Sequence, residues 1–211
     1  MPNPIRRSLT LATLLAASLA LAGCDRLGGG GTASTADAMT LGDPKAKVKM
    51  VEYASLSCVH CAHFNNDVFP AFKKKYIDTG KVHYTLREVL TEPVQVAAAG
   101  YLTARCAGPA NYFKVVDAAF LGFDQMMKTG DARANLLAAA KAGGLTEAQF
   151  VACVSDEAAL EALHARTNQI AAEGEISGTP TFFFNGKKVS DQAMTPAQLD
   201  AAVAAAAKAA R

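Results

Sequence analysis

The sequence predicts an α/β fold in which a strand–helix–strand unit precedes a helical block, and two strands and a last helix follow. Apolar and polar residues alternate over 47–54 and again over 81–88, on either side of a segment with helical spacing. Residues 93–174 are rich in alanine and contain no strand-like run. Strand signals return at 181–184, followed by an Asn-Gly pair that is a strong hairpin signal. At 211 residues, we expect one domain, or one domain with an insertion.

The N-terminus predicts an exported lipoprotein. Two arginines precede an apolar stretch, 9–22, that is too short to cross a bilayer as a stable helix. This stretch ends in Leu21-Ala22-Gly23-Cys24, which resembles the bacterial lipobox, so we expect removal of residues 1–23 and lipid on Cys24. An ordinary signal peptide that ends near a cysteine is the alternative. Asp25 resembles the signal that retains such lipoproteins at the inner membrane in enterobacteria.

Residues 24–39 are predicted to form a lipidated, flexible tether. The stretch 26–39 is rich in glycine, serine, threonine and alanine and has no capacity to fold by itself. Removal of residues 1–23 takes away two arginines and no acid, which leaves 19 basic side chains against 19 acidic ones. A near-neutral chain without a basic face or an acidic run argues against nucleic acid and against a cationic partner.

The first half of the predicted fold is a βαβ unit. After the strand at 47–54, a helix is expected from Cys58 to about Ile77, with a bend or break at Pro70. The second strand, 81–88, follows at a spacing typical of parallel strands joined by a right-handed crossover.

Two capping boxes place helix starts in the second half of the chain. Residues 146–149, Thr-Glu-Ala-Gln, start the helix that carries Cys153, and a further helix is expected over 157–172. Residues 195–198, Thr-Pro-Ala-Gln, start the last helix, with proline at its first position.

The motif Cys58-Val59-His60-Cys61 lies where the first strand gives way to a helix. Unpaired N–H groups and the positive end of the helix dipole favour a thiolate at Cys58. The two-residue spacing lets the Cys61 sulfur attack the Cys58 sulfur and close a small, reducible disulfide. His60 can donate a hydrogen bond or a charge to this thiolate, which makes the disulfide form a stronger oxidant.

A zinc site is the competing interpretation, with Cys58, Cys61 and either His60 or His63 as ligands. Structural zinc sites need four ligands, and the chain has no second CxxC or HxxxH pattern. The motif therefore favours redox chemistry.

Two further cysteines, Cys106 and Cys153, lie in the helical block. With Cys24 assigned to lipid, four cysteines remain, the even number that two disulfides in an exported protein would need. We expect a structural disulfide between them; buried free thiols and an accessory redox pair are the alternatives.

The chain resembles the DsbA-like proteins of the thioredoxin superfamily. The resemblance rests on the CVHC motif, on Thr179-Pro180 before a ββα end, and on Glu52 six residues before Cys58. It implies a thioredoxin fold in two parts, 40–90 and 175–211, with a helical insertion at 91–174. Val59 departs from the proline common at this position of the family motif.

The resemblance also implies a role for each of these residues. Cys58 would be the exposed sulfur that a substrate thiolate attacks. Pro180 would follow a cis peptide bond and face the motif, and Thr179 would offer backbone groups to an extended substrate segment. Glu52 resembles the family's buried acid, a candidate proton acceptor for Cys61 if buried. Alternation in the strand leaves open that Glu52 faces solvent instead.

The expected function is a membrane-tethered thiol–disulfide oxidoreductase that introduces disulfides into exported proteins. It would work as a monomer in the periplasm, held at the inner membrane, with no cofactor besides its redox-active disulfide and no metal. A DsbB-like membrane protein would re-oxidise it. The alternatives are a disulfide isomerase or reductase of the same fold, a metal-binding lipoprotein, and a non-catalytic chaperone.

Overall fold

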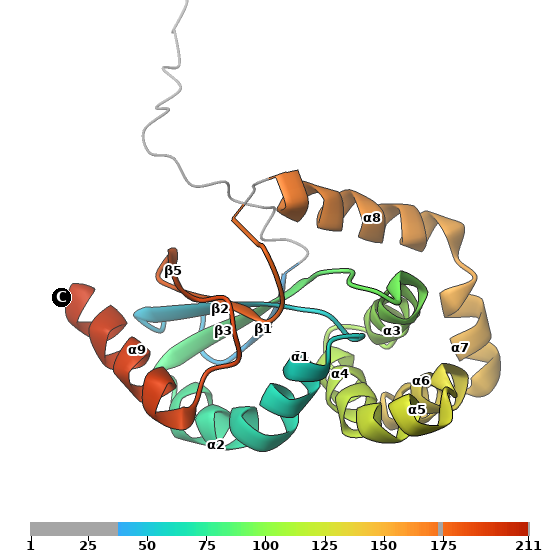
Figure 1. The fold of residues 1–211 in the computed structure, drawn as a ribbon, viewed down its shortest axis with the longest axis horizontal. Coiled ribbons are helices and arrows are strands. Elements are labelled where there is room, and N and C mark those ends of the chain that lie inside the picture. The colour runs from blue at the N-terminus through green and yellow to red at the C-terminus, as the bar shows by residue number, and fades with distance from the viewer. Residues whose placement is uncertain (1–37, 173–174, 211) are drawn as a thin grey trace, which may run out of the picture. The chain divides into compact units, whose positions relative to one another are not determined.

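A mixed sheet with the strand order β1-β3-β2-β4-β5 lies at the centre of the structure, a computed structural model that describes residues 38–172 and 175–210 (Figure 1). Strands β2 and β3 are parallel, whereas β1 pairs with β3, β4 with β2, and β5 with β4 in the antiparallel sense. The strands are β1 Met39–Leu41, β2 Val48–Ala54, β3 Val82–Glu88, β4 Thr181–Phe184 and β5 Lys187–Ser190.

The helix after the CxxC motif contains two wider turns. It comprises α1 Val59–His63, the π-helical segment Phe64–Val68, α2 Phe69–Phe72 and a second π-helical segment, Lys73–Ile77. The Phe69 N–H bonds the Phe64 carbonyl, five residues back, directly before Pro70. Because Pro70 has no N–H to donate, the expected irregularity takes the form of a wide turn just before the proline.

Six helices follow β3: α3 Val94–Cys106, α4 Tyr112–Leu121, α5 Phe123–Thr129, α6 Ala132–Ala142, α7 Glu147–Val154 and α8 Glu157–Ala172. The predicted capping box before α7 is confirmed: the Gln149 backbone N–H donates to the Thr146 hydroxyl, and the Thr146 N–H donates to the Gln149 side chain. The predicted helix over 157–172 is confirmed as α8.

A buried ion-pair cluster joins the last strand residue of β3 to three of these helices. The Glu88 carboxylate is 3% exposed. It accepts hydrogen bonds from Arg105 Nε of α3 at 2.6 Å and from the Tyr112 hydroxyl of α4 at 3.0 Å. Arg166 Nε of α8 lies 3.4 Å from its second oxygen. The cluster therefore ties α3, α4 and α8 to the end of the sheet.

The C-terminal ββα unit matches its sequence signals. Asn185 and Gly186 both have positive φ, 48° and 78°, as the two-residue hairpin turn between β4 and β5 requires. The second predicted capping box, at Thr195, starts α9 Pro196–Ala209. Figure 1 shows α1, α2 and α9 on one side of the sheet and α8 on the other. The element order predicted from the sequence is therefore confirmed.

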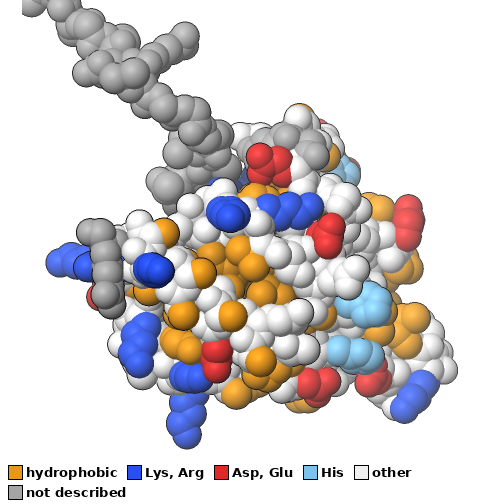
Figure 2. All heavy atoms as spheres, turned by 60° about the vertical axis from the view of Figure 1, so that its left-hand side comes forward, with side chains coloured by type: hydrophobic (Ala, Val, Ile, Leu, Met, Phe, Trp, Pro, Cys, Tyr) orange, Lys and Arg blue, Asp and Glu red, His pale blue; other side chains and the backbone are white. Residues whose placement is uncertain are grey.

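The outer strand β5 is protected by charge. Lys187 and Lys188 are exposed on it, and lysines on an edge strand oppose pairing with another chain. Figure 2 shows the corresponding face, where hydrophobic side chains gather near the centre and lysine or arginine side chains lie around them.

One prediction about the N-terminal region is wrong. Met39, assigned to the tether, opens the short strand β1, which pairs with Leu86 to Tyr84 of β3. The predicted signal peptide, the lipid site Cys24 and tether residues 26–37 lie outside the described residues. Within the described residues, no helix has both the length and the apolar character needed to span a membrane.

Candidate active site

Cys58 caps the N-terminus of α1 with its own side chain. Its backbone is extended (φ −96°, ψ 118°), and its sulfur accepts a hydrogen bond from the Cys61 N–H at 3.2 Å. One of the unpaired amides that begin every helix is therefore bonded to the sulfur, at the positive end of the helix dipole. Cys58 and Cys61 are both free thiols in the structure. Cys58, which the sequence led us to expect as an exposed sulfur, is instead 9% exposed, because Cys58 lies in the core cluster at the start of α1.

The two sulfurs have opposite electrostatic environments. Hydrogen bonds lower the pKa of Cys58 to about 6. The largest effect comes from the Cys61 thiol, and smaller ones come from the Thr179 side chain and from the backbone N–H groups of Cys61 and His60. Burial and the neighbouring Cys58 sulfur raise the pKa of Cys61 far above its ordinary value, and the charge of Glu52 adds to this effect. Cys58 is therefore a thiolate at neutral pH, and Cys61 keeps its proton.

His60 lowers the pKa of Cys58 through a hydrogen bond from its backbone N–H. Its side chain lines a cleft of about 430 Å³ beside the motif, together with Thr179, Pro180 and the segment Asp191–Ala193. His63 does not line this cleft in the described structure; its Nε2 is 3.4 Å from Asp124 of α5.

Thr179 contacts the reactive sulfur, and Pro180 follows it in the chain. The peptide bond between them is cis. In the thiol form, Cys58 Sγ donates a hydrogen bond to the Thr179 carbonyl at 3.3 Å. The structure therefore brings the CxxC motif and Thr179-Pro180 together, although 121 residues separate Cys58 from Thr179.

Glu52 points into the protein beneath the motif and is 4% exposed. The Tyr84 hydroxyl donates to its Oε2 at 2.7 Å. Burial raises the pKa of Glu52 to about 8; the Tyr84 bond opposes the rise, and the charge of Cys58 adds to it. At neutral pH the side chain is thus mostly a neutral acid, able to exchange a proton near pH 8.

The described residues do not assemble a metal site. Across residues 38–172 and 175–210, no three histidine, cysteine or carboxylate side chains are close enough to hold an ion. The ligand set considered from the sequence, with His60 or His63 beside the two cysteines, is not brought together.

Cys106 and Cys153 form a disulfide that links the end of α3 to α7, away from the CxxC pair. It closes a loop of 47 residues. In the chain-entropy model, a cross-link of this span stabilises the fold by about 3–4 kcal/mol.

Tyr84 is the site residue that the sequence did not reveal. It alternates with Val82 and Leu86 on the buried face of β3, so the strand pattern alone could have placed it in the core. Its bond to Glu52 depends on the parallel pairing of β2 with β3, in which Tyr84 lies opposite Met50.

Comparisons with known proteins agree with this geometry. Residues 34–205 match the family model described as "Thioredoxin". A protein of Rickettsia bellii named "Putative protein-disulfide oxidoreductase" is 36% identical over 149 residues, 70% of this chain and 57% of that protein. The chain thus spans little more than half the length of the curated relatives that it matches.

Solved structures show the same fold. A threonine-to-valine variant of alpha-DsbA1 from Wolbachia pipientis superposes with a TM-score of 0.72 at 26% identity, covering 82% of this chain and 92% of that one. The thiol-disulfide oxidoreductase MdbA of Actinomyces oris has a TM-score of 0.67 at 24% identity, over 80% and 85% of the two chains. With its thioredoxin-like mixed sheet, its inserted helices and the family match over 34–205, this chain belongs to the thioredoxin family.

Proposed function

We propose that this protein is a thiol–disulfide oxidoreductase of the DsbA type, which passes its Cys58–Cys61 disulfide to client proteins with free thiols. The observation that carries the proposal is the contrast between the sulfurs, a pKa of about 6 at Cys58 and one raised far above the ordinary value at Cys61. The names of the curated relative and of the solved structures support the same activity.

The reaction begins with the oxidised pair. A client thiolate attacks the Cys58 sulfur, a client–Cys58 disulfide forms, and the Cys58–Cys61 bond breaks with its electron pair on Cys61. Because Cys61 is buried and its pKa is raised, it takes up a proton, and Glu52 is the buried acid able to supply it.

The second step releases the product. A second client thiolate attacks the client sulfur of the mixed disulfide, and Cys58 leaves as a thiolate. The client has lost two electrons and gained a disulfide, and the CxxC pair has gained those electrons. A leaving group with a pKa of about 6 departs readily, and a stable Cys58 thiolate favours the reduced pair.

The cleft beside the motif is where the client chain lies in this proposal. Thr179 and cis-Pro180 form one wall of it, next to the Cys58 sulfur, and His60 lies in it as well. The Thr179 backbone pairs with the extended client segment.

The direction of the reaction is tested by the reduction potential of the Cys58–Cys61 pair, measured in glutathione buffers. The double variant Cys106→Ala, Cys153→Ala isolates the motif from the second disulfide. We expect a potential well above the value of about −270 mV for thioredoxin and towards about −120 mV for DsbA. A potential near that of thioredoxin would contradict the oxidase assignment and favour a reductase that receives its electrons from a donor.

The cellular setting is part of the proposal. The lipobox-like Leu21-Ala22-Gly23-Cys24 supports an exported lipoprotein at the periplasmic face of the inner membrane, re-oxidised there by a DsbB-like protein. Tethering would raise the effective concentration of the two partners. Membrane fractionation of the natural chain and of Cys24→Ala tests it: the natural chain should sediment with membranes and the variant should not. Equal release of both into the soluble fraction would refute the tether.

A further inference from the structure

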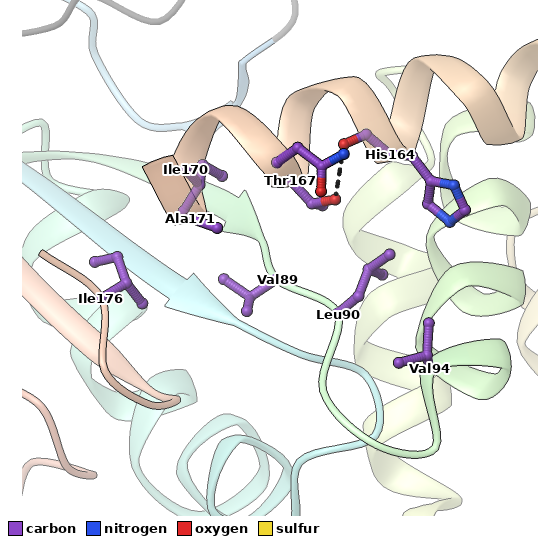
Figure 3. A pocket seen from close by; sticks show the side chains of 9 residues that line it. Val89, Leu90, Val94, His164, Thr167, Ile170, Ala171 and Ile176 are labelled. Atoms are coloured by element: carbon purple, nitrogen blue, oxygen red, sulfur yellow. Dashed lines mark hydrogen bonds between the residues drawn. The ribbon is translucent and has the colours of Figure 1, made fainter. Parts of the chain in front are cut away.

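A second hollow lies on the α8 side of the sheet, distinct from the cleft that contains His60. It has a volume of about 370 Å³, within the range of about 300–1,000 Å³ typical of ligand clefts. Figure 3 shows α8 along one side of it and the chain that follows β3 along the other, with Ile176 at one end. We call it the α8 groove; its apolar lining consists of Val89, Leu90, Val94, Ile170, Ala171 and Ile176.

The lining suits an uncharged, apolar group. Of the side chains that border the α8 groove in the described part of the chain, none is a carboxylate, a lysine or an arginine. His164, Thr167 and Asn168 add polar atoms at the α8 side. The Thr167 hydroxyl donates there to the His164 carbonyl at 3.1 Å (Figure 3). Val89, Leu90, Val94 and Ile176 are all partly exposed, so apolar surface faces solvent in the hollow.

Two segments that border the α8 groove lead along the chain to residues that contact Cys58 or its neighbour. On one wall, Leu90 is followed by Thr91, whose carbonyl accepts a hydrogen bond at 2.8 Å from Ser57, the neighbour of Cys58. At the end of the groove, Ile176 lies three residues before Thr179, whose carbonyl accepts a hydrogen bond from Cys58 itself.

Gly178 lies between the groove residue Ile176 and Thr179 beside the motif, and it is exposed. A Cβ atom added at Gly178, between Ile176 and Thr179, would meet no atom within 4 Å. A chain that pairs with the Thr179 backbone therefore has room to continue past Gly178 towards the groove.

We propose that the α8 groove binds an apolar side chain of the client polypeptide, in the extended segment that flanks the client cysteine held at Cys58. This inference rests on the proposed function. A client that has not yet folded exposes the apolar side chains that its native core will bury. The groove would thus direct the enzyme to unfolded chains before they bury their cysteines.

The test uses the oxidised full chain and short serine- and glycine-based peptides with two cysteines. One leucine is moved through about six positions on either side of the first cysteine, a span set by the reach of an extended chain. The second-order rate of peptide oxidation is compared with that of the peptide carrying serine at the same position. We expect leucine to accelerate oxidation about tenfold within one window of positions, the scale of one apolar side chain entering a pocket.

Two alanines on α8 provide matched variants. Ala171→Phe fills the groove and should reduce the leucine-to-serine rate ratio to near unity. Ala165→Phe adds the same bulk to an exposed position of the same helix outside the groove and should keep the tenfold ratio. Ile176→Ser, in the loop before Thr179, makes the groove polar without altering a helix and should also lower the ratio.

The outcomes separate the two proposals. If no peptide is oxidised, the proposed function fails. If all peptides are oxidised at one rate, or if the leucine preference survives in both Ala171→Phe and Ile176→Ser, the proposed oxidoreductase activity stands and the groove proposal is overturned. Loss of the preference in those two variants, but not in Ala165→Phe, supports it.

Discussion

Replacing Glu52 by glutamine should remove a pH dependence of stability that the structure builds into the core. Glutamine has nearly the shape of the protonated acid, carries no charge and keeps an oxygen that can accept from Tyr84. Glu52 is 4% exposed, and burial raises its pKa from 4.5 to about 8. In the unfolded chain the side chain ionises at its ordinary pKa.

The sign of the effect follows from proton binding. Between pH 4.5 and about 8, the folded chain keeps a proton on Glu52 that the unfolded chain has already released. The free energy of unfolding therefore falls as the pH rises through this window and levels off above it. The difference between the two pKa values corresponds to roughly 5 kcal/mol.

The assay is urea denaturation of the reduced chain and of Glu52→Gln, followed by circular dichroism from about pH 5 to about pH 9. The two chains should be similarly stable at the acid end, and the variant should be the more stable at the alkaline end by the amount just given. Subtracting one curve from the other removes the titrations that both chains share. Glu161→Gln, which changes an exposed glutamate of α8, is the matched control and should follow the natural chain. Parallel curves for the natural chain and Glu52→Gln would refute the assignment of Glu52 as a buried neutral acid.

Three further predictions concern the Cys58 thiolate, Tyr84 and Glu88. The ultraviolet absorbance of the thiolate in the reduced chain should reach half its maximum near pH 6 and be lost in Cys58→Ser, because hydrogen bonds lower the pKa of Cys58 to about 6; a midpoint near the ordinary value of 9.0 would contradict this. Tyr84→Phe removes the bond that lowers the pKa of Glu52, so the Glu52-dependent transition should move to higher pH by about one unit or more; an unchanged or lower midpoint would rule out this role. Glu88→Gln removes the buried negative charge that pairs with Arg105 and Arg166, so the free energy of unfolding should fall by about 3 kcal/mol in urea denaturation; a loss below about 1 kcal/mol would show that the charge of Glu88 contributes no more than an exposed ion pair.

Much of the fold could be predicted because its signals are local. Alternation predicted β2 and β3, an Asn-Gly pair predicted the turn between β4 and β5, and two Thr-x-x-Gln capping boxes predicted the starts of α7 and α9. Each signal lies within a few residues of the element that it specifies. The strand β1 was missed because Met39–Leu41 is too short to show alternation, and it exists through its pairing with β3.

The sequence by itself determined where the chemistry would lie. The position of Cys58 at a strand-to-helix junction depends on neighbouring residues only, and so does its access to the helix N-terminus. The tertiary structure decided which groups surround the sulfurs. It turned Glu52 inward, set the Tyr84 hydroxyl against it, and brought Thr179 to Cys58 across 121 residues. The physical reason is that burial and contacts between distant segments set the pKa values of these groups, and both exist only once the strands have paired and the core has closed.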